Sequence, residues 1–383
     1  MTYSVPNYGR MIEPGPRLEA YVKAMEDVIE PGSVVVEIGT GTGFFAVLAA
    51  RLGADRVYAI EPEESIQVGR EMARANGVED RVTFLHGLST EIELDERADV
   101  LISDLRGALP LYGTHIPSIM DARARHLKPG GAILPLKDAI RVAVAHDPKS
   151  YREHVEPWSP APEGFAMEPQ RQRAVNSWFV QRVERRHLRT DPVTWVELEY
   201  DSIDSPDVEQ PILWEVERAG TAHGLSVWFD ASIGPDAAFT TGPDGPELVY
   251  GSAFFPFERP LDLRAGDRLH VDMRAKLVGE DYTWVWNSSL VGTDGEERAA
   301  FEQSTMRGSP VTAERLRQRA GDFRPALSDD GRVDRFILGR MDGARSLQQI
   351  ATDVREEFPA SFESAGDALT RVADLSVRYS RAT

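Results

Sequence analysis

Residues 34–50 read VVVEIGTGTGFFAVLAA, and this stretch decides the fold. Strand-forming residues through Ile38 lead into Gly39, Gly41 and Gly43, and an apolar helix-length run begins at Phe44. Glycine is needed in such a bend because tight turns use positive φ and because a side chain would keep the backbone away from a ligand. The stretch therefore predicts a strand, a ligand-binding turn and a helix, which together form the opening unit of a doubly wound parallel sheet.

The same alternation of strand and helix patterns continues from residue 33 to about 145. Short β-branched runs predict strands at Val34–Ile38, Arg56–Ile60, Val82–His86, Asp99–Ser103 and Ala132–Pro135. Amphipathic segments predict helices at Gly43–Leu52, Glu64–Asn76 and Ile116–His126. We therefore expect an α/β, Rossmann-like domain over residues 33–145, with helices on both faces of the sheet. Residues 1–32 are predicted to form one or two helices before it, because Arg17–Ile29 has helical periodicity.

The composition changes in the second half of the chain. Glu156–Pro169 is rich in proline and predicts a connector or an ordered arm. From Trp178 to Asn287, strand patterns separated by Pro, Gly and Asp turns predict a β-barrel or sandwich domain over residues 146–310, or a β extension with no site of its own. Apolar helical faces after Ser346 and Glu363 predict a small helical or winged-helix module over residues 325–383.

Composition excludes several classes of protein. The 383 residues contain no cysteine, so disulfides, thiolate metal sites, iron–sulfur clusters and cysteine nucleophiles are excluded. With 43 Lys and Arg against 62 Asp and Glu, the net charge of −19 argues against nucleic acid as a partner. No His, Asp and Glu cluster has metal-ligand spacing. The chain has neither a signal-peptide pattern nor an apolar run that could span a membrane, so we expect a soluble, cytoplasmic protein.

A carboxylate after the second strand completes the nucleotide-site pattern. Glu61 stands where an acidic side chain accepts hydrogen bonds from both hydroxyls of a ribose. Dinucleotide enzymes share this pattern, so NAD remains an alternative. The G-x-G-x-G spacing and the segment Lys128-Pro129-Gly130-Gly131 before the fifth strand favour S-adenosylmethionine, whose carboxylate Arg17 could bind. The alternative to a binding site is that Glu37 and Glu61 are ordinary surface carboxylates at strand ends.

Over residues 3–300 the sequence resembles the protein arginine methyltransferase family. The similarity lies in MIEPGPRLEAY (Met11–Tyr21), VEIGTGTG (Val36–Gly43), YAIEP (Tyr58–Pro62) and LHGLSTEIEL (Leu85–Leu94). The resemblance implies a homodimer that associates through an arm near residues 155–200. It also implies that S-adenosylmethionine is bound by Arg17, Glu37, Gly39, Gly41, Gly43, Glu61, Pro62, Ser89, Thr90 and Ser103.

Departures from the family fall on the acceptor side. The two-glutamate loop of the family maps onto Ser103–Gly113, where the first glutamate is replaced by Asp104 and the second by Gly113. The Thr-His-Trp loop maps near Leu248-Val249-Tyr250 and lacks its histidine. A guanidinium presents a rigid fork of donors that opposed carboxylates hold best, so arginine is not the acceptor we expect.

Residues that follow the fourth predicted strand are the candidates for chemistry. Asp104 is expected to orient the acceptor or to accept its proton, and His115 is a second candidate base, although a capping or surface role is the alternative for that histidine. Tyr112 and Tyr250 are expected to line the acceptor pocket, with core packing as the alternative for Tyr112. No residue is assigned to a metal.

These features together predict an S-adenosylmethionine-dependent methyltransferase. Its acceptor is expected to be an oxygen or nitrogen nucleophile of a peptide or small molecule in a modification pathway. The alternatives are a peptidyl-arginine methyltransferase and a non-catalytic cofactor-binding scaffold whose acceptor site has degenerated. The C-terminal segment resembles peptide-binding winged-helix modules through Asp342-Gly343, Ser346-Leu347 and Ile350. An appendage that only packs on the rest of the protein is equally consistent with that pattern.

Overall fold

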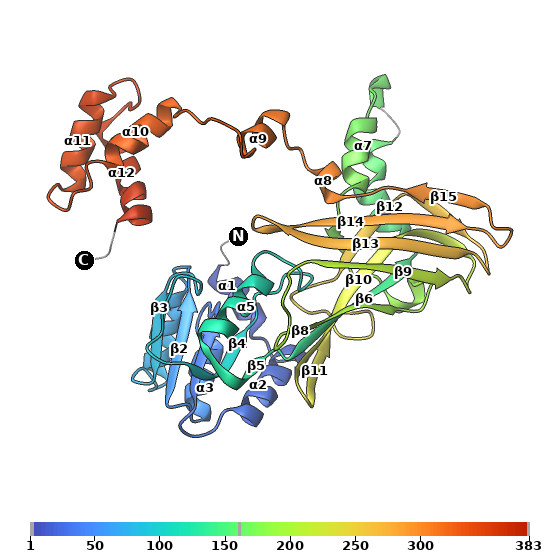
Figure 1. Ribbon diagram of the computed structural model, residues 1–383, viewed down its shortest axis with the longest axis horizontal. Helices are drawn as coiled ribbons and strands as arrows, with labels where there is room; N and C mark the ends of the chain where they lie inside the picture. Colours follow the sequence, from blue (N-terminus) through green and yellow to red (C-terminus); the bar gives the residue numbers. More distant parts are fainter. Residues whose placement is uncertain (1–3, 160–161, 381–383) are drawn as a thin grey trace. The chain divides into compact units, whose positions relative to one another are not determined.

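The glycine-rich stretch lies at the centre of a parallel sheet in the computed structural model, which describes residues 4–159 and 162–380 (Figure 1). The sheet has the strand order β3-β2-β1-β4-β5. Its strands are β1 (Val34–Ile38), β2 (Arg56–Glu61), β3 (Val82–His86), β4 (Ala98–Ser103) and β5 (Leu127–Leu134). The order reverses between β1 and β4, where Ile38 pairs with Ser103 at the carboxyl ends of the strands. Ligands of doubly wound sheets bind at this kind of reversal.

Helices cover both faces of this sheet. These helices are α2 (Pro16–Val28), α3 (Phe44–Leu52), α4 (Ile66–Ala75) and α5 (His115–Arg125), and α1 (Val5–Met11) precedes them in the chain. Val35 packs in one core with residues of α2, α3 and α4, whereas Val34 and Val36 pack in a second core with residues of α5. Burial on both faces explains why β1 is apolar almost throughout. The predicted doubly wound domain is confirmed.

Antiparallel strands form the rest of the first unit of the chain, which ends at Pro310. One sheet has the order β7-β12-β10-β6-β8, with β11 also paired to β10, and the other has the order β15-β14-β13-β9. The first sheet contains β6 (Lys137–Ala145), β7 (Phe179–Val180), β8 (Val193–Glu199), β10 (Gly220–Gly234), β11 (Ala237–Thr240) and β12 (Ala253–Leu263). The second contains β9 (Val208–Glu215), β13 (Arg268–Val278), β14 (Asp281–Val291) and β15 (Glu297–Phe301). The predicted β domain is confirmed.

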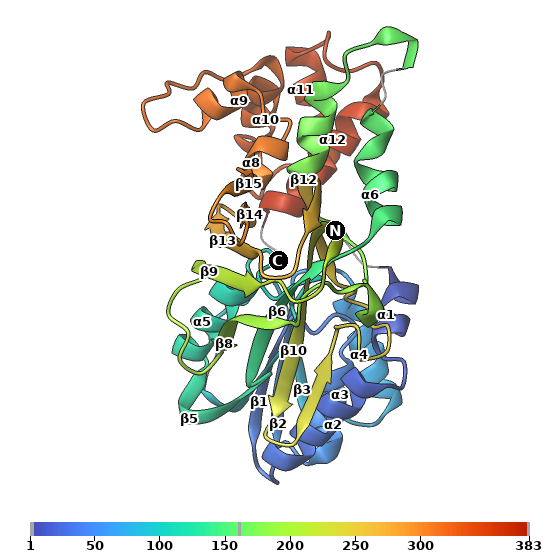
Figure 2. The ribbon, with the colours of Figure 1, turned by 90° about the vertical axis from the view of Figure 1, so that its right-hand side faces the viewer.

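The boundary between these two domains lies earlier than residue 145. β6 pairs with β10 and β8, so residues 137–145 belong to the antiparallel sheet. The predicted boundary at 145 included these residues in the parallel domain, and no strand was predicted for them. The domains are closely joined, since α2 packs against both β10 and β11 (Figure 2).

Short helices fill the region predicted to be an arm. They are α6 (Pro148–His154), η1 (Glu156–Trp158), η2 (Pro162–Gly164), α7 (Glu168–Val175) and η3 (Arg185–His187), and α8 (Thr305–Gly308) follows β15. The proline-rich segment 156–169 thus contains two 3-10 turns and the first residues of α7, rather than a simple connector. Tyr151 of α6 donates hydrogen bonds to the carbonyls of Phe257 and Glu258, which fixes α6 to β12.

The second unit of the chain begins at Val311, and its described residues, 311–380, are helical. It contains α9 (Ala313–Gln318), α10 (Asp329–Leu338), α11 (Leu347–Glu357) and α12 (Ala365–Tyr379). Ser346 and Ser364 each close a capping box at the start of α11 and α12. Residues of α10, α11 and α12 share a small apolar core. The described part of this unit, residues 311–380, has no strand, so it is helical without the wing of a winged-helix fold.

Candidate functional site

The glycine turn after β1 has the conformation that its sequence requires. Gly39, Gly41 and Gly43 all have positive φ, at +73°, +55° and +78°. A Cβ on Gly39 would lie 2.2 Å from Cδ2 of Leu105, and one on Gly41 would lie 2.4 Å from Cε1 of Tyr8. Because the three glycines have no side chains, they leave the backbone at the carboxyl end of β1 uncovered. Tyr8 of α1 lies against this backbone.

Glu61, at the tip of β2, is held beside this turn. Its Oε2 accepts a hydrogen bond from the backbone N–H of Gly41 at 2.8 Å, and its Oε1 accepts one from the N–H of Glu63 at 3.0 Å. Burial raises the pKa of this carboxyl, and the two N–H donors oppose that rise. A carboxylate has about four lone-pair sites, so one site on each oxygen remains for a pair of ligand hydroxyls.

Glu37 lies one strand away but is enclosed more completely. Thr40 donates a hydrogen bond from its hydroxyl to Oε2 of Glu37 at 2.5 Å. Burial raises the pKa of Glu37 to about 7, because the ionised form loses its hydration and gains few donors in return. Glu37 therefore supports the turn through Thr40, and near neutral pH a large fraction of it carries a proton.

Other predicted cofactor residues lie along the same edge with different degrees of exposure. The Pro62 carbonyl contacts Nε2 of His86 at 2.9 Å, and the Ser89 carbonyl accepts a hydrogen bond from Arg125 at 2.6 Å. Thr90 is exposed. Ser103 is fully buried at the end of β4, and its hydroxyl has no hydrogen-bond partner. A buried hydroxyl without a partner is costly, so Ser103 marks a position where a polar ligand atom would be stabilised.

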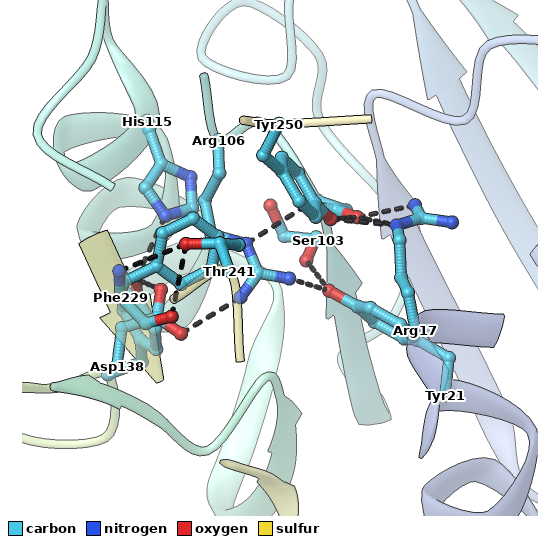
Figure 3. A network of polar contacts seen from close by, with 11 residues as sticks. Arg17, Tyr21, Ser103, Arg106, His115, Asp138, Phe229, Thr241 and Tyr250 are labelled. Atoms are coloured by element: carbon cyan, nitrogen blue, oxygen red, sulfur yellow. Dashed lines mark hydrogen bonds and ion pairs between the residues drawn. The ribbon is translucent and has the colours of Figure 1, made fainter. Parts of the chain in front are cut away.

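Arg17, Asp104 and Tyr250 come together although they lie far apart in the sequence, and Figure 3 shows Tyr250 beside Arg17. Nε and Nη2 of Arg17 donate to Oδ2 of Asp104 at 3.0 and 2.5 Å, and Nη1 donates to the Met11 carbonyl at 2.5 Å. The Tyr250 hydroxyl donates to Oδ2 of Asp104 at 2.5 Å and accepts from Nε of Arg17 at 2.7 Å. Arg17 thus binds Asp104, and it could hold a ligand carboxylate only by sharing its guanidinium between the two.

Arg106, which the sequence analysis missed, is the second cation on Asp104. Its Nε donates to Oδ1 of Asp104 at 3.0 Å, its Nη1 to Oδ1 of Asp138 at 2.9 Å, and its Nη2 to the Tyr21 hydroxyl at 2.6 Å. Figure 3 shows the guanidinium between Asp138 on one side and Tyr21 on the other. The side chains of Arg106 and Asp138 are fully buried.

These two arginines determine the chemistry that Asp104 can perform. Burial alone would raise its pKa, but the charges of Arg106 and Arg17 and the hydrogen bonds to the carboxylate outweigh it and hold the pKa of Asp104 far below its usual range. A carboxylate with such a low pKa accepts protons poorly. Of the two roles predicted for Asp104, the structure therefore favours orientation of a bound group over proton acceptance.

His115 lies apart from Asp104. Its Nε2 is 3.0 Å from the Tyr200 hydroxyl, which donates to Oδ2 of Asp138 at 2.5 Å, so the histidine joins Asp104 only through Tyr200, Asp138 and Arg106. Because the hydroxyl proton goes to Asp138, Nε2 of His115 must be the donor, and its Nδ1 is buried without a partner. Burial lowers the pKa of His115 to about 3. This environment supports a structural role for the neutral imidazole.

Tyr112 and Tyr250, the two predicted acceptor-pocket residues, lie in different surroundings. Tyr250 is buried against Asp104, whereas the Tyr112 side chain is 42% exposed and lies over Gly107, where a Cβ would approach its ring to 2.7 Å. The structure thus places Tyr250 with Arg17 and Asp104, and places Tyr112 on the outer side of the loop that follows β4.

One signal could have revealed the missed network. Asp138 lies on the same buried face of β6 as Ile140 and Val142, and an acidic residue at such a position is rarely buried without a cationic partner. Within residues 4–159 and 162–380, no group of His, Asp and Glu side chains could hold a metal ion. The helices in those ranges are all too short or too polar to cross a membrane.

Two protein-family models match this chain over adjoining regions. The model described as ribosomal protein L11 methyltransferase (PrmA) matches residues 19–134. The model described as arginine methyltransferase oligomerization subdomain matches residues 138–279. The point where the first match gives way to the second agrees with the start of β6, which is also where the antiparallel sheet begins.

Individual relatives are named as probable protein arginine N-methyltransferases. Probable protein arginine N-methyltransferase 6 of Arabidopsis thaliana is 31% identical over 255 residues, covering 63% of this chain and 58% of that protein. Probable protein arginine N-methyltransferase 6.1 of Oryza sativa subsp. indica is 38% identical over 152 residues, covering 39% of this chain and 40% of that protein. The chain thus spans only about half the length of these two relatives.

Solved structures share the fold. A Trypanosoma brucei PRMT1 enzyme–prozyme heterotetrameric complex with AdoHcy has a TM-score of 0.71 at 24% identity and covers 78% of this chain and 96% of that chain. Protein arginine methyltransferase 10 of Arabidopsis thaliana has a TM-score of 0.69 at 19% identity and covers 79% and 97%. These similarities confirm the resemblance to protein arginine methyltransferases that the sequence motifs indicated.

Proposed function

We propose that this chain, which shares the two-domain architecture of protein arginine methyltransferases, is an S-adenosylmethionine-dependent methyltransferase. The proposed acceptor is a nitrogen or oxygen nucleophile of a peptide or small molecule. The observation that carries the proposal is Glu61, which is fixed by two backbone N–H groups beside a turn of three positive-φ glycines and keeps lone pairs for ligand hydroxyls.

The residues at this edge fit an adenosyl ligand. Glu61 would accept the ribose hydroxyls through its remaining lone pairs, and Ser103 offers a hydroxyl that lacks a partner. When bound, S-adenosylmethionine supplies an electrophilic methyl group on a positively charged sulfur. The loop after β4 then has the task of aligning an acceptor, and alignment of this kind can lower a barrier by roughly 7–11 kcal/mol.

The part played by Asp104 in this proposal is orientation. The carboxylate stays ionised because two guanidinium groups surround it, so it offers a fixed negative charge next to the proposed methyl-donor site. A neutral amine or hydroxyl would be held by donating a hydrogen bond to this charge. An acceptor whose proton leaves readily, or whose nucleophilic atom is already deprotonated, fits such a site best.

Peptidyl arginine is a second candidate acceptor, supported by the names of the relatives. Against it, Gly113 provides no carboxylate at the position of the family's second glutamate, and the one acid present is already bound by two arginines of the chain. A cofactor-binding scaffold without turnover is the third possibility, and the saturation of Asp104 by internal partners supports it.

Self-association is proposed on the match of residues 138–279 to an oligomerization subdomain, with a homodimer as the assembly. Sedimentation-velocity analysis of the full chain tests it, and a concentration-independent monomer would contradict it.

Calorimetric titration with S-adenosylhomocysteine is the main test of the proposed function. We expect saturable binding at one site per chain, and an absence of binding in a folded preparation would refute the proposal. Incubation with labelled S-adenosylmethionine and a panel of peptides with and without arginine, followed by mass spectrometry, distinguishes the three alternatives. A methylated non-arginine product supports the main proposal, dimethylarginine supports the second, and binding without any product supports the scaffold.

A further inference from the structure

The contacts around the Arg106 side chain are those of a bound guanidinium ligand. All three of its guanidinium nitrogens donate, Nε to Asp104, Nη1 to Asp138 and Nη2 to the hydroxyl of Tyr21. The two carboxylates come from different domains, because Asp104 follows β4 and Asp138 lies on β6. Carboxylates that accept hydrogen bonds from separate nitrogens of the planar guanidinium fix its orientation and also balance its charge.

Aromatic rings complete this enclosure. The central carbon of the guanidinium lies 5.3 Å from the centroid of the Phe229 ring and 5.5 Å from those of Phe239 and Tyr250. The ring of Tyr21 lies at 5.9 Å. Cation–π attraction acts over these distances and is strongest where water is absent, as it is around this buried side chain.

We propose that Arg106 fills a guanidinium-binding site built from Asp104, Asp138 and Tyr21, and that by doing so it denies Asp104 to any acceptor that carries a guanidinium. The first part concerns the chain alone. The second part rests on the proposed function, since it takes Asp104 as the residue that orients the acceptor. If Asp104 has this role, Arg106 determines the specificity for the acceptor. It disfavours arginine as the acceptor and favours other nucleophiles.

An ordinary ion pair would not need this arrangement. Lysine could neutralise one carboxylate, but a single ammonium group cannot present three nitrogens in one plane to Asp104, Asp138 and Tyr21. Removal of the side chain beyond Cβ would leave a cavity that retains both carboxylates, the hydroxyl and the rings. Such a cavity matches the free guanidinium ion in charge, shape and donor number.

Chemical rescue of Arg106→Ala tests the proposal. The thermal midpoint of the full-length variant is measured with increasing low-millimolar guanidinium chloride, and in parallel with tetramethylammonium chloride, which has the same charge but no N–H donor. We expect guanidinium to raise the midpoint by roughly 3 °C or more and to saturate, because a ligand that binds only the folded state stabilises it. Tetramethylammonium should have no such effect.

Arg123→Ala is the matched control. Arg123 also anchors loops through its guanidinium, but its Nη1 and Nη2 donate only to the carbonyls of Tyr200 and Ile203 at 2.9 and 2.6 Å, with no carboxylate. Guanidinium should therefore not rescue Arg123→Ala. An equal rise in both variants, or no saturable rise in Arg106→Ala, would overturn the proposed site.

Two further outcomes test the proposed site when the variant does not fold, and the proposed exclusion of arginine as an acceptor. If Arg106→Ala does not fold alone, the yield of folded protein on refolding with guanidinium against sodium becomes the measurement, and an unchanged yield overturns the site. Methylation of an arginine peptide by the wild-type chain would overturn the exclusion of arginine. Because rescue requires no cofactor, its failure is distinguishable from failure to bind S-adenosylhomocysteine, which concerns the proposed function alone.

Discussion

Nη1 of Arg106 donates to Oδ1 of Asp138 at 2.9 Å, and this fully buried contact joins the loop after β4 to the first strand of the antiparallel domain. Through Asp104 the same network reaches Arg17 on α2, so both domains and α2 are joined by one network of ion pairs. The geometry of the acceptor side of the site therefore depends on how the two domains pack together.

Asp138→Asn should be strongly destabilising. Removing one charge of a buried pair leaves Arg106 without compensation, which costs about 3–5 kcal/mol of unfolding free energy. Glu197→Gln is the control, because Glu197 pairs with the adjacent Lys137 at 3.2 Å at the surface, where such pairs contribute about 0–1 kcal/mol. Urea unfolding of the two variants checks the difference, and similar losses would show that the buried pair adds little.

Glu61→Gln should weaken binding of S-adenosylhomocysteine. The amide keeps one acceptor oxygen but turns its NH₂ group toward a backbone N–H, so we expect affinity to fall roughly 30-fold, equivalent to about 2 kcal/mol. Calorimetry provides the measurement. Glu64→Gln, an exposed position three residues away, should bind like the wild type. Unchanged affinity in Glu61→Gln would remove this residue from the site.

Gly41→Ala should disturb the turn and the helix that covers it. The alanine Cβ would lie 2.4 Å from the Tyr8 ring at a φ of +55°, so both backbone strain and displacement of α1 are expected. Gly77→Ala separates these effects, because Gly77 has a φ of +64° and no atom within 4 Å of the added Cβ. Each substitution should lower the unfolding free energy by about 1–2 kcal/mol through backbone strain, but only Gly41→Ala should abolish calorimetric binding of S-adenosylhomocysteine. Loss of S-adenosylhomocysteine binding in both variants would indicate a general effect on folding.

His115 should make stability fall in mild acid. Its pKa is about 3 in the folded chain and about 6.5 when unfolded, so below pH 6.5 the unfolded chain takes up a proton that the folded chain does not. Between pH 6.5 and 4.5 this uptake should remove about 2 kcal/mol of stability. His115→Gln lacks the titration, so its unfolding free energy should decline less over that range. Parallel declines in the two proteins would contradict the assignment.

Deletion of residues 311–383 should leave the remaining chain folded. The helices α10, α11 and α12 have their own core and lie in a unit separate from residues 1–310. The thermal midpoint of the 1–310 fragment should stay within about 2 °C of the main transition of the full chain, and its affinity for S-adenosylhomocysteine should be unchanged. A lower midpoint would show that the C-terminal unit stabilises the methyltransferase-like part.

Local features of the site could be predicted from the sequence because their causes are local. The three glycines and Glu61 follow from the backbone path of a single strand–turn–helix unit, and the structure places them together at the edge of the sheet. The two domain types follow likewise from the periodicity of their strands and helices.

Contacts between distant segments could not be predicted in this way. The sequence motif indicated Arg17 as a partner for a ligand, but its guanidinium binds Asp104, 87 residues away. His115 looked like a base because it lies near Asp104 in the sequence, yet β6 and Tyr200 determine its surroundings. Such pairings depend on which strands meet, and no strand was predicted at the position of β6.

The division of the buried charges between the domains has a consequence for protein engineering. A chimera that took its first 135 residues from this chain and its β sheets from a relative would inherit Arg106 but not Asp138, and the reverse exchange would inherit the acid without its cation. Where the relative lacks the matching residue, either hybrid would contain an unpaired buried charge at the junction of the two domains. Recombination of this scaffold should therefore transplant the two residues as one unit.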